Sequence, residues 1–198
     1  MLRMPALETA RLTIRPFFMD DLQSIHRILD VELKQAELGT EGALSVAERE
    51  EWMRWTVLNY EQLANLNQPP YGDRAVTLQP GGQLIGACGF VPCMNPFGQL
   101  PGFLAQGPSA SERLTSTEFG LFYAIAPDFQ GQGYATEAAR AMVEYAFAQL
   151  RLRRVVATTT YDNLASIGVM HKLGMRIERN PYPEPPWLQV VGLLENMV

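Results

Sequence analysis

The chain has 198 residues, 47% of them hydrophobic and 19% charged, which predicts one folded domain over 1–198 and excludes a disordered chain. Its formal net charge of −5 argues against a general nucleic-acid binder, because neutralising phosphates needs clustered Lys and Arg. Two cysteines and two histidines argue against a structural zinc site or a disulfide framework, and the lack of a long apolar run predicts a cytoplasmic protein with no membrane partner.

The first third of the chain predicts one strand and two helices. Residues 11–17 alternate between polar and apolar, as a strand does, and Asp20 is expected to cap a helix over 20–29. A capping box begins the second helix, 45–67, with Glu48 at its third position. The predicted buried side of this second helix consists of Trp52, Trp55, Val57, Leu58 and Leu63.

The middle of the chain predicts a hairpin, a loop, a strand and a helix. Two β-rich runs within 74–91 flank Pro80-Gly81-Gly82, which is a hairpin pattern. Residues 92–115 are rich in Gly, Pro, Ser and Gln and are predicted to be a loop insertion. A strand is expected over 116–127, and helical spacing of apolar residues predicts a helix over 134–150.

The last quarter predicts a strand at 154–161 and a short helix at 164–173, with Gly174 suited to its left-handed end. Two more strands are expected around a Pro-rich bend. The complete order, β-α-α-β-β-β-α-β-α-β-β, predicts an α/β fold with a mixed central sheet flanked by helices.

The turn between the strand at 116–127 and the helix at 134–150 contains Gly131 and Gly133. Glycine permits the positive φ angles of a tight turn, and it also exposes backbone N–H groups at the positive end of the following helix. The second use suits a phosphate or pyrophosphate. A P-loop is excluded because the segment has no lysine, and Thr136 stands where a dinucleotide fingerprint needs Gly or Ala.

Gln130, Gly133 and Ala135 form the pattern Gln-x-x-Gly-x-Ala, which resembles the pyrophosphate-binding motif of the GNAT family of N-acetyltransferases. "EFGLFYAIAP" (118–127) is similar to that family's central strand, and "NLASIGVMHKLGM" (163–175) to its downstream helix. The start, "ETARLTIRPF", resembles the branch of ribosomal-protein alanine N-acetyltransferases. The resemblance covers nearly the whole chain apart from 92–115.

The resemblance implies a splayed central strand that holds acetyl-CoA as cosubstrate, with no metal. Backbone N–H groups near the end of that strand would stabilise the oxyanion. Glu137, in the first helical turn, is expected to complement the helix dipole. The implied acetyl-CoA contacts are Tyr123, Ala124, Ile125, Gln130, Gly131, Gln132, Gly133, Tyr134, Ala135, Asn163 and Ser166.

Glu118 is the candidate general base, because the family often places a carboxylate on the central strand. A lysine-like amine, with a pKa of about 10.4, must lose a proton before it can attack a thioester, whereas an α-amine loses it more easily. The alternative for Glu118 is a glutamate that faces solvent or forms an ion pair.

Many family members protonate the leaving thiolate with a tyrosine seven residues after the asparagine, where this chain has Met170. Ser166 is the candidate replacement as a hydrogen-bond donor. Asn163 can either contact CoA or cap the helix, and it shares one helix face with Ser166 and Met170. Weaker acid candidates are Tyr123, Tyr134 and Tyr161.

These features predict an enzyme, monomeric or dimeric, that transfers an acetyl group from acetyl-CoA to a primary amine by direct attack. The acceptor is open between a protein N-terminus and a small-molecule amine. The rival hypothesis is a catalytically silent acyl-CoA-binding or regulatory module of the same fold, which the methionine at position 170 favours.

Overall fold

The computed structural model describes residues 4–34, 42–103 and 115–197, so residues 104–114 of the predicted insertion lie outside the described part. Its hydrogen-bonded strands follow the order β1-β2-β3-β4-β5-β6-β8-β7. The β5–β6 pair is parallel, whereas β1–β2, β2–β3, β3–β4, β6–β8 and β7–β8 are antiparallel. The predicted α/β fold with a mixed sheet is confirmed.

Two compact units make up the chain, and each is described by itself. The first consists of Met1–Phe90 and Phe122–Tyr145, and the second of Val91–Leu121 and Ala146–Val198. Strands β4 (Leu84–Asn95) and β5 (Ser116–Ile125) contribute residues to both.

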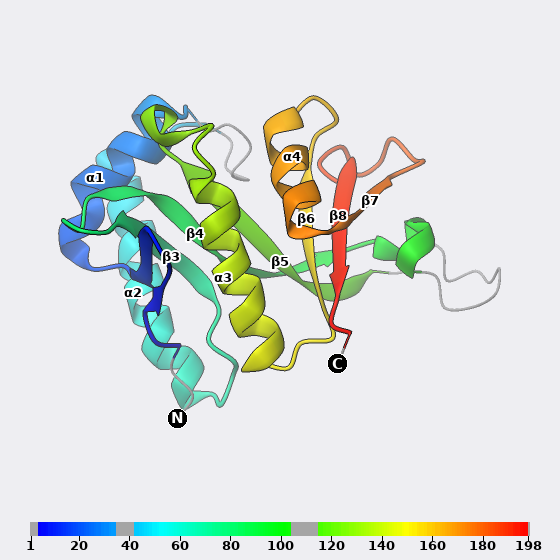
Figure 1. The fold of residues 1–198 in the computed structure, drawn as a ribbon, viewed down its shortest axis with the longest axis horizontal. Coiled ribbons are helices and arrows are strands. Elements are labelled where there is room, and N and C mark those ends of the chain that lie inside the picture. The colour runs from blue at the N-terminus through cyan, green and yellow to red at the C-terminus, as the bar shows by residue number, and fades with distance from the viewer. Residues whose placement is uncertain (1–3, 35–41, 104–114, 198) are drawn as a thin grey trace. The chain divides into compact units, whose positions relative to one another are not determined.

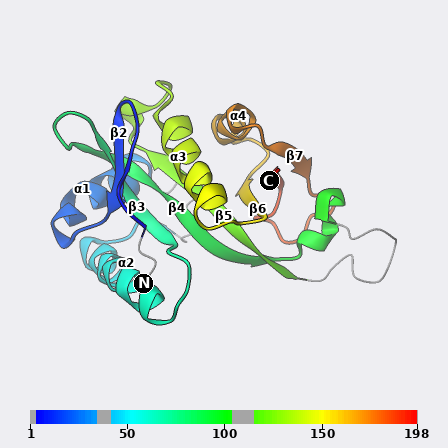
Figure 2. The same cartoon turned by 60° about the horizontal axis from the view of Figure 1, so that its bottom comes forward.

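In the first unit, a strand, two helices, three strands and a helix follow one another in the predicted order, with the short strand β1 added at the start. Figures 1 and 2 show α3 on one face of these strands and α1 and α2 on the other. Besides parts of β4 and β5, the unit contains β1 (Leu7–Glu8), β2 (Leu12–Pro16), η1 (Met19–Asp21), α1 (Leu22–His26), η2 (Arg27–Glu32), α2 (Val46–Asn65), β3 (Gly72–Leu78), η5 (Pro127–Phe129) and most of α3 (Tyr134–Ala148).

The core of the first unit forms where the strands meet α1 and α2. Strand residues alternate between faces, so small residues of β3, β4 and β5 turn toward the same helices. This leaves room for bulky helix residues against the sheet. The core includes Phe17, Ile25, Ile28, Leu29, Met53, Ala75, Ala87 and Ala124.

The predicted cap at Asp20 is wrong, and the helix continues past Leu29 to the end of η2 at Glu32. The carboxylate of Asp21, one residue later, accepts a hydrogen bond of 2.9 Å from the N–H of Phe18. Asp21 is also held by the guanidinium of Arg15, 2.7 Å away, which fixes its side chain over the start of the turn.

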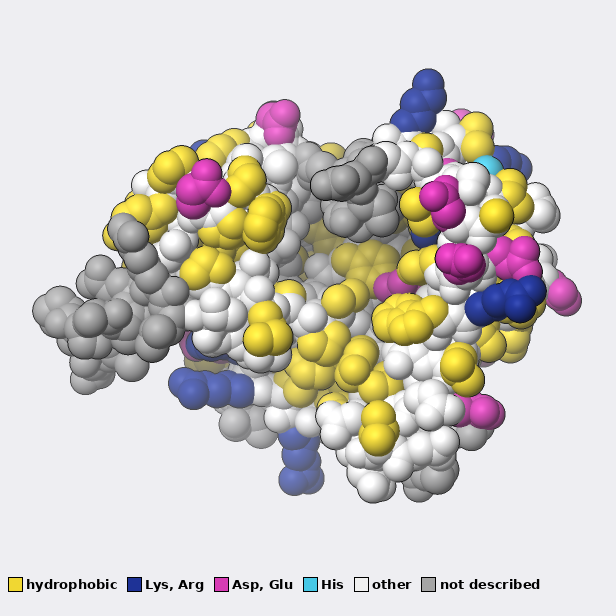
Figure 3. Space-filling view, turned by 180° about the vertical axis from the view of Figure 1, so that it is seen from behind, with side chains coloured by type: hydrophobic (Ala, Val, Ile, Leu, Met, Phe, Trp, Pro, Cys, Tyr) yellow, Lys and Arg dark blue, Asp and Glu magenta, His cyan; other side chains and the backbone are white. Residues whose placement is uncertain are grey.

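The start of α2 is confirmed, and its predicted buried side is wrong at two positions. Ser45 and Glu48 form the reciprocal capping box. Trp55 and Leu58 are 59% and 56% exposed, because the sheet packs against a neighbouring face of the helix, which contains Met53. In Figure 3, which views the molecule from behind, hydrophobic side chains lie on the surface among acidic ones.

The second unit contains the end of β4, the start of β5, a parallel β5–β6 contact at Gly120 and Val156, and an antiparallel layer formed by β6, β8 and β7. Gly174 ends α4 with a φ of 82°, as predicted. The remaining elements are η3 (Phe97–Gln99), η4 (Pro101–Phe103), β6 (Arg154–Thr159), α4 (Leu164–Leu173), β7 (Arg176–Arg179) and β8 (Val190–Glu195).

The loop predicted over 92–115 is wrong at its beginning. Strand β4 continues to Asn95, and the side chains of Phe97 and Leu100 are fully buried against a core that includes Val191. The richness of this stretch in Gly, Pro, Ser and Gln gave no sign that Phe97 and Leu100 belong to the core. Among the described residues, no helix combines the length and hydrophobicity needed to span a membrane.

Candidate active site

The glycine loop lies between the last residue of β5 and the first turn of α3. Gly131 and Gly133 have φ angles of 72° and 85°, in the left-handed region where other residues are strained. The side-chain amide of Gln130 donates a 2.9 Å hydrogen bond to the carbonyl of Ile125, which ties the loop to the end of the strand. Gln130 and Gly133 of the predicted motif therefore each have a defined local role.

Helix α3 begins directly after this loop, and the N–H of Glu137 donates to the carbonyl of Gly133 at 3.0 Å. By helix geometry, N–H groups of the first turn lack intrahelical carbonyl partners and carry the positive end of the dipole. Residues 131–133 are exposed, so an anion can approach the loop. This arrangement suits a phosphate group.

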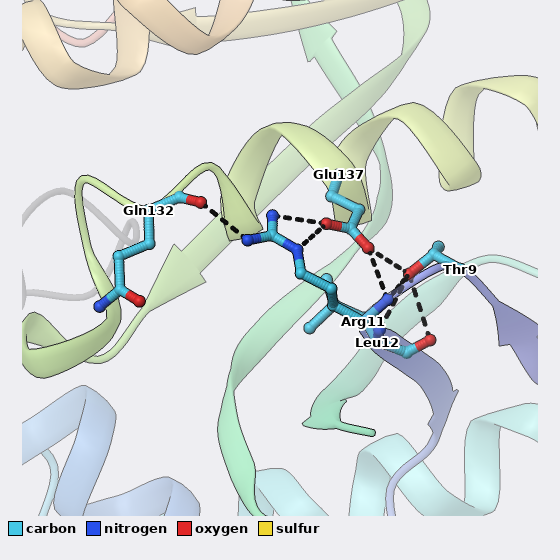
Figure 4. A network of polar contacts seen from close by, with 5 residues as sticks. All are labelled: Thr9, Arg11, Leu12, Gln132 and Glu137. Atoms are coloured by element: carbon cyan, nitrogen blue, oxygen red, sulfur yellow. Dashed lines mark hydrogen bonds and ion pairs between the residues drawn. The ribbon is translucent and has the colours of Figure 1, made fainter. Parts of the chain in front are cut away.

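Arg11, directly before β2, holds the glycine loop from the side (Figure 4). Its Nε donates to Oε2 of Glu137 at 2.7 Å, and its Nη1 donates to the carbonyl of Gln132 at 3.1 Å. The guanidinium also lies over the ring of Tyr134, 4.3 Å from the centroid. Oε1 of Glu137 accepts a 2.6 Å hydrogen bond from the hydroxyl of Thr9.

The charge of Glu137 is therefore compensated. Burial alone would raise the pKa of this carboxyl, but hydrogen bonds from Thr9 and Arg11 outweigh that effect and lower it. Glu137 lies in the first turn of α3, where the helix dipole favours an anion. It also binds Arg11, and the sequence gave no sign of this second interaction.

Tyr123, Ala124 and Ile125 form the end of β5 in the same unit as the loop. A Cβ atom added at Gly86 of β4 would lie 2.1 Å from the carbonyl oxygen of Ala124, so glycine is needed for the backbones to approach this closely. One residue further on, the N–H of Ala126 donates to the carbonyl of Ile85 at 2.8 Å. These contacts fix the backbone proposed to face the thioester.

In the second unit, Glu118 lies on β5 and forms an ion pair with Arg154 of β6. Nε of Arg154 donates to one carboxylate oxygen at 2.7 Å, and Nη2 contacts the other. Glu118 is only 7% exposed, and the guanidinium lies over the ring of Phe103. Glu118 is therefore ion-paired and does not face solvent.

The residues of α4 predicted to contact the cosubstrate include its N-cap. Oδ1 of Asn163 accepts a 2.9 Å hydrogen bond from the N–H of Ser166, so the capping role of Asn163 is confirmed. Met170 is fully buried, and its sulfur would lie 2.9 Å from a Cβ at Gly192 of β8. The position that holds tyrosine in the family pattern is a packing position in this chain.

Asp73 was missed by the sequence reasoning. It lies on the face of β3 toward α2, where burial raises the pKa of its carboxyl to about 6, against the lowering effects of Arg49 and of a hydrogen bond from Trp52. Such a raised pKa makes the half-buried Asp73 a candidate for a functional role. The available signal was an aspartate inside a β-rich run, where aspartate is depleted.

Arg11 was also missed, because its partners lie more than 120 residues away in the sequence. Among the described residues, no group of three or more His, Cys, Asp and Glu side chains could hold a metal ion.

Comparison with known proteins gives a family match over most of the chain. The family model described as "Acetyltransferase (GNAT) domain" matches residues 11–176. One curated relative, FsC-acetyl coenzyme A-N(2)-transacetylase of Aspergillus fumigatus, is 44% identical over 79 residues, which are 38% of this chain and 33% of that protein. The chain spans about a third of the length of the first curated relatives it matches.

Solved structures match over the whole length. An acetyltransferase of the GNAT family from Bacillus anthracis has a TM-score of 0.69 and 20% identity, with 98% of this chain and 99% of that chain covered. The ribosomal-protein-S5-alanine acetyltransferase of Vibrio fischeri has a TM-score of 0.65 and 15% identity, with 97% of each chain covered. These likenesses establish the fold.

Proposed function

The chain belongs to the GNAT family of acetyltransferases, and from that premise we propose that it transfers the acetyl group of acetyl-CoA to a primary amine in the cytoplasm. The family and the named relatives make it an acetyl-CoA-dependent acyltransferase. The observation that carries the proposal is the exposed loop with Gly131 and Gly133 in left-handed conformations at the start of α3. Backbone N–H groups of residues 130–135 would bind the pyrophosphate.

The remaining cosubstrate contacts are proposed from the family pattern. Backbone N–H groups of Tyr123, Ala124 and Ile125 would stabilise negative charge on the thioester oxygen as the amine attacks. A C–N bond forms, the C–S bond breaks, and the thiolate leaves without a covalent enzyme intermediate. Ser166 would donate a hydrogen bond to that thiolate, and Asn163 would hold the first turn of α4 in place.

The ion pair limits how Glu118 can act. Both carboxylate oxygens are engaged by Arg154, so an amine proton reaches Glu118 only if one of those contacts gives way. This favours an acceptor that needs little help from a base. An α-amine, with a pKa of about 7.7–8.0, is such an acceptor, whereas a lysine-like amine is not.

The named relatives support two acceptor classes. The name of the Aspergillus fumigatus relative, an N(2)-transacetylase, gives a nitrogen acceptor and mentions no protein, so we take a small-molecule amine as the first class. The Vibrio fischeri structure is called a ribosomal-protein-S5-alanine acetyltransferase, which points to the α-amine of a protein. The preference for an α-amine leads us to propose the second class first.

The test is thiol release from acetyl-CoA over a panel of acceptors: peptides beginning with alanine or serine, the same peptides with a blocked N-terminus, and small-molecule amines. Release that requires the unblocked peptide supports the proposal. Ser166→Ala should lower kcat, and Glu118→Gln should do so less for α-amines than for lysine-like amines. Binding of CoA without thiol release for any amine would instead support the silent module.

A further inference from the structure

We infer that Arg11 is a positioning residue for the pyrophosphate of acetyl-CoA, holding the glycine loop in its binding geometry and neutralising Glu137 beside it. This inference rests on the proposed function, because it concerns the same cosubstrate. Nothing in the family pattern quoted for the loop, Gln130 to Ala135, includes a residue from the start of the chain. The inference comes from the network drawn in Figure 4.

The donors of the Arg11 guanidinium are directed at the protein. Nε and Nη2 lie 2.7 and 2.6 Å from Oε2 of Glu137, and Nη1 lies 3.1 Å from the carbonyl of Gln132. The flat side of the guanidinium lies over the ring of Tyr134. Because each of its three nitrogen atoms has a protein partner, Arg11 acts on the cosubstrate through the loop.

The backbone at and around Arg11 is held in place by hydrogen bonds. The N–H of Gln79 donates to the carbonyl of Arg11 at 2.8 Å, and the N–H of Thr9 donates to the carbonyl of Leu12 at 2.9 Å. A loop with two left-handed glycines has more conformations than one of ordinary residues. Ordering it when the cosubstrate binds would weaken affinity, and a fixed guanidinium lessens that cost by ordering it beforehand.

The charge of Glu137 is a second reason to expect that Arg11 supports CoA binding. Glu137 lies in the first turn of α3, where an incoming pyrophosphate would meet its carboxylate as a like charge. The pairing with Arg11 cancels that charge, and Glu137 is held by Thr9 and by the N–H of Arg11 as well. If Arg11 is removed, the loop loses a contact and the carboxylate stays in place without its counter-charge.

The experiment is calorimetric titration of CoA, and a thermal-shift titration of pantetheine, which lacks the phosphates. The variants are Arg11→Ala, Glu137→Gln and the double variant. The control is Arg15→Ala, which removes another bidentate arginine–carboxylate pair, the pair of Arg15 with Asp21, four residues from Arg11 on β2. Circular dichroism verifies that each variant is folded.

We expect Arg11→Ala to weaken CoA binding about tenfold, or about 1.4 kcal/mol, and to leave pantetheine binding unchanged. Adding Glu137→Gln to Arg11→Ala should restore part of the CoA affinity, because it removes the uncompensated charge. Arg15→Ala should bind CoA as the wild type does. If Arg11→Ala fails to fold, Arg11→Lys takes its place, because lysine keeps the positive charge but lacks the planar guanidinium with its several donors. Arg11→Lys should also weaken CoA binding.

Equal CoA affinity in the wild type and in Arg11→Ala would overturn the inference. An equal loss of affinity for CoA and for pantetheine in Arg11→Ala would overturn it as well. A wild type that binds no CoA contradicts the proposed function instead. The two failures are thereby distinguishable.

Discussion

Asp30 and Arg49 form a buried, two-pronged ion pair between η2 and α2, with Oδ1 of Asp30 2.7 Å from Nη2 of Arg49 and Oδ2 2.8 Å from Nε. Both residues are only 5% exposed. A second buried arginine of the same unit, Arg74 on β3, differs in its surroundings. Within the described part of the chain, its Nε and Nη1 have no hydrogen-bond partner, and its guanidinium lies 5.5 Å from the centroid of the Tyr60 ring.

Replacing each of these arginines by methionine should therefore give opposite results. Arg49→Met leaves the carboxylate of Asp30 buried without its partner and should lower the free energy of unfolding by about 3–5 kcal/mol. Arg74→Met removes a desolvated cation and should leave stability unchanged or raise it by about 1 kcal/mol. Urea denaturation of both variants measures the difference, and an equal loss in both would contradict the interpretation.

Asp73→Asn should make stability less dependent on pH. The pKa of this carboxyl is raised from 3.8 to about 6 in the folded protein, so the folded state holds its proton more tightly than the unfolded state. Stability is therefore lost as the pH rises from about 4 to 6 and stays lost above that. The asparagine variant should be more stable at pH 8, by on the order of 2 kcal/mol, and equal to the wild type at pH 4.

Thermal unfolding at the two pH values decides this prediction. A variant that is destabilised equally at pH 4 and pH 8 would mean that the carboxyl contributes by packing and not by its titration.

Gly168→Ala should stabilise α4. Gly168 lies inside this helix, and a Cβ added there meets no atom within 4 Å. Alanine is favoured over glycine in a helix interior by about 0.8–1.0 kcal/mol, so the midpoint of urea denaturation should rise. A lower midpoint would contradict the prediction, because it would mean that the added methyl group is not accommodated.

Local chemistry made most of the elements predictable. The capping box of Ser45 and Glu48 and the left-handed end at Gly174 depend on neighbours within a few residues, and both are confirmed. The face of α2 that the sheet covers depends on distant strands, which is why Trp55 and Leu58 were wrongly expected to be buried. The loop-like composition of residues 92–115 likewise gave no sign that Phe97 is buried.

In the candidate site, too, features set by sequence neighbours could be predicted, and features set by distant segments could not. The glycine loop could be predicted because its conformation is coded by the glycines themselves. The partner of Glu118 lies 36 residues away, and Arg11 lies 126 residues from Glu137. Pairings at such distances are set by how strands and helices pack, so single residues give little sign of them.

The central claim, that the glycine loop binds the pyrophosphate of acetyl-CoA, is tested most directly by calorimetric titration of CoA into the wild type, Gly133→Val and Gly82→Val. Both glycines have positive φ angles, 85° and 69°, so both substitutions strain the backbone similarly, but only Gly133 lies in the loop. The wild type and Gly82→Val should each bind one CoA, and Gly133→Val should not. Undiminished binding by Gly133→Val, or no binding by the wild type, would contradict the claim.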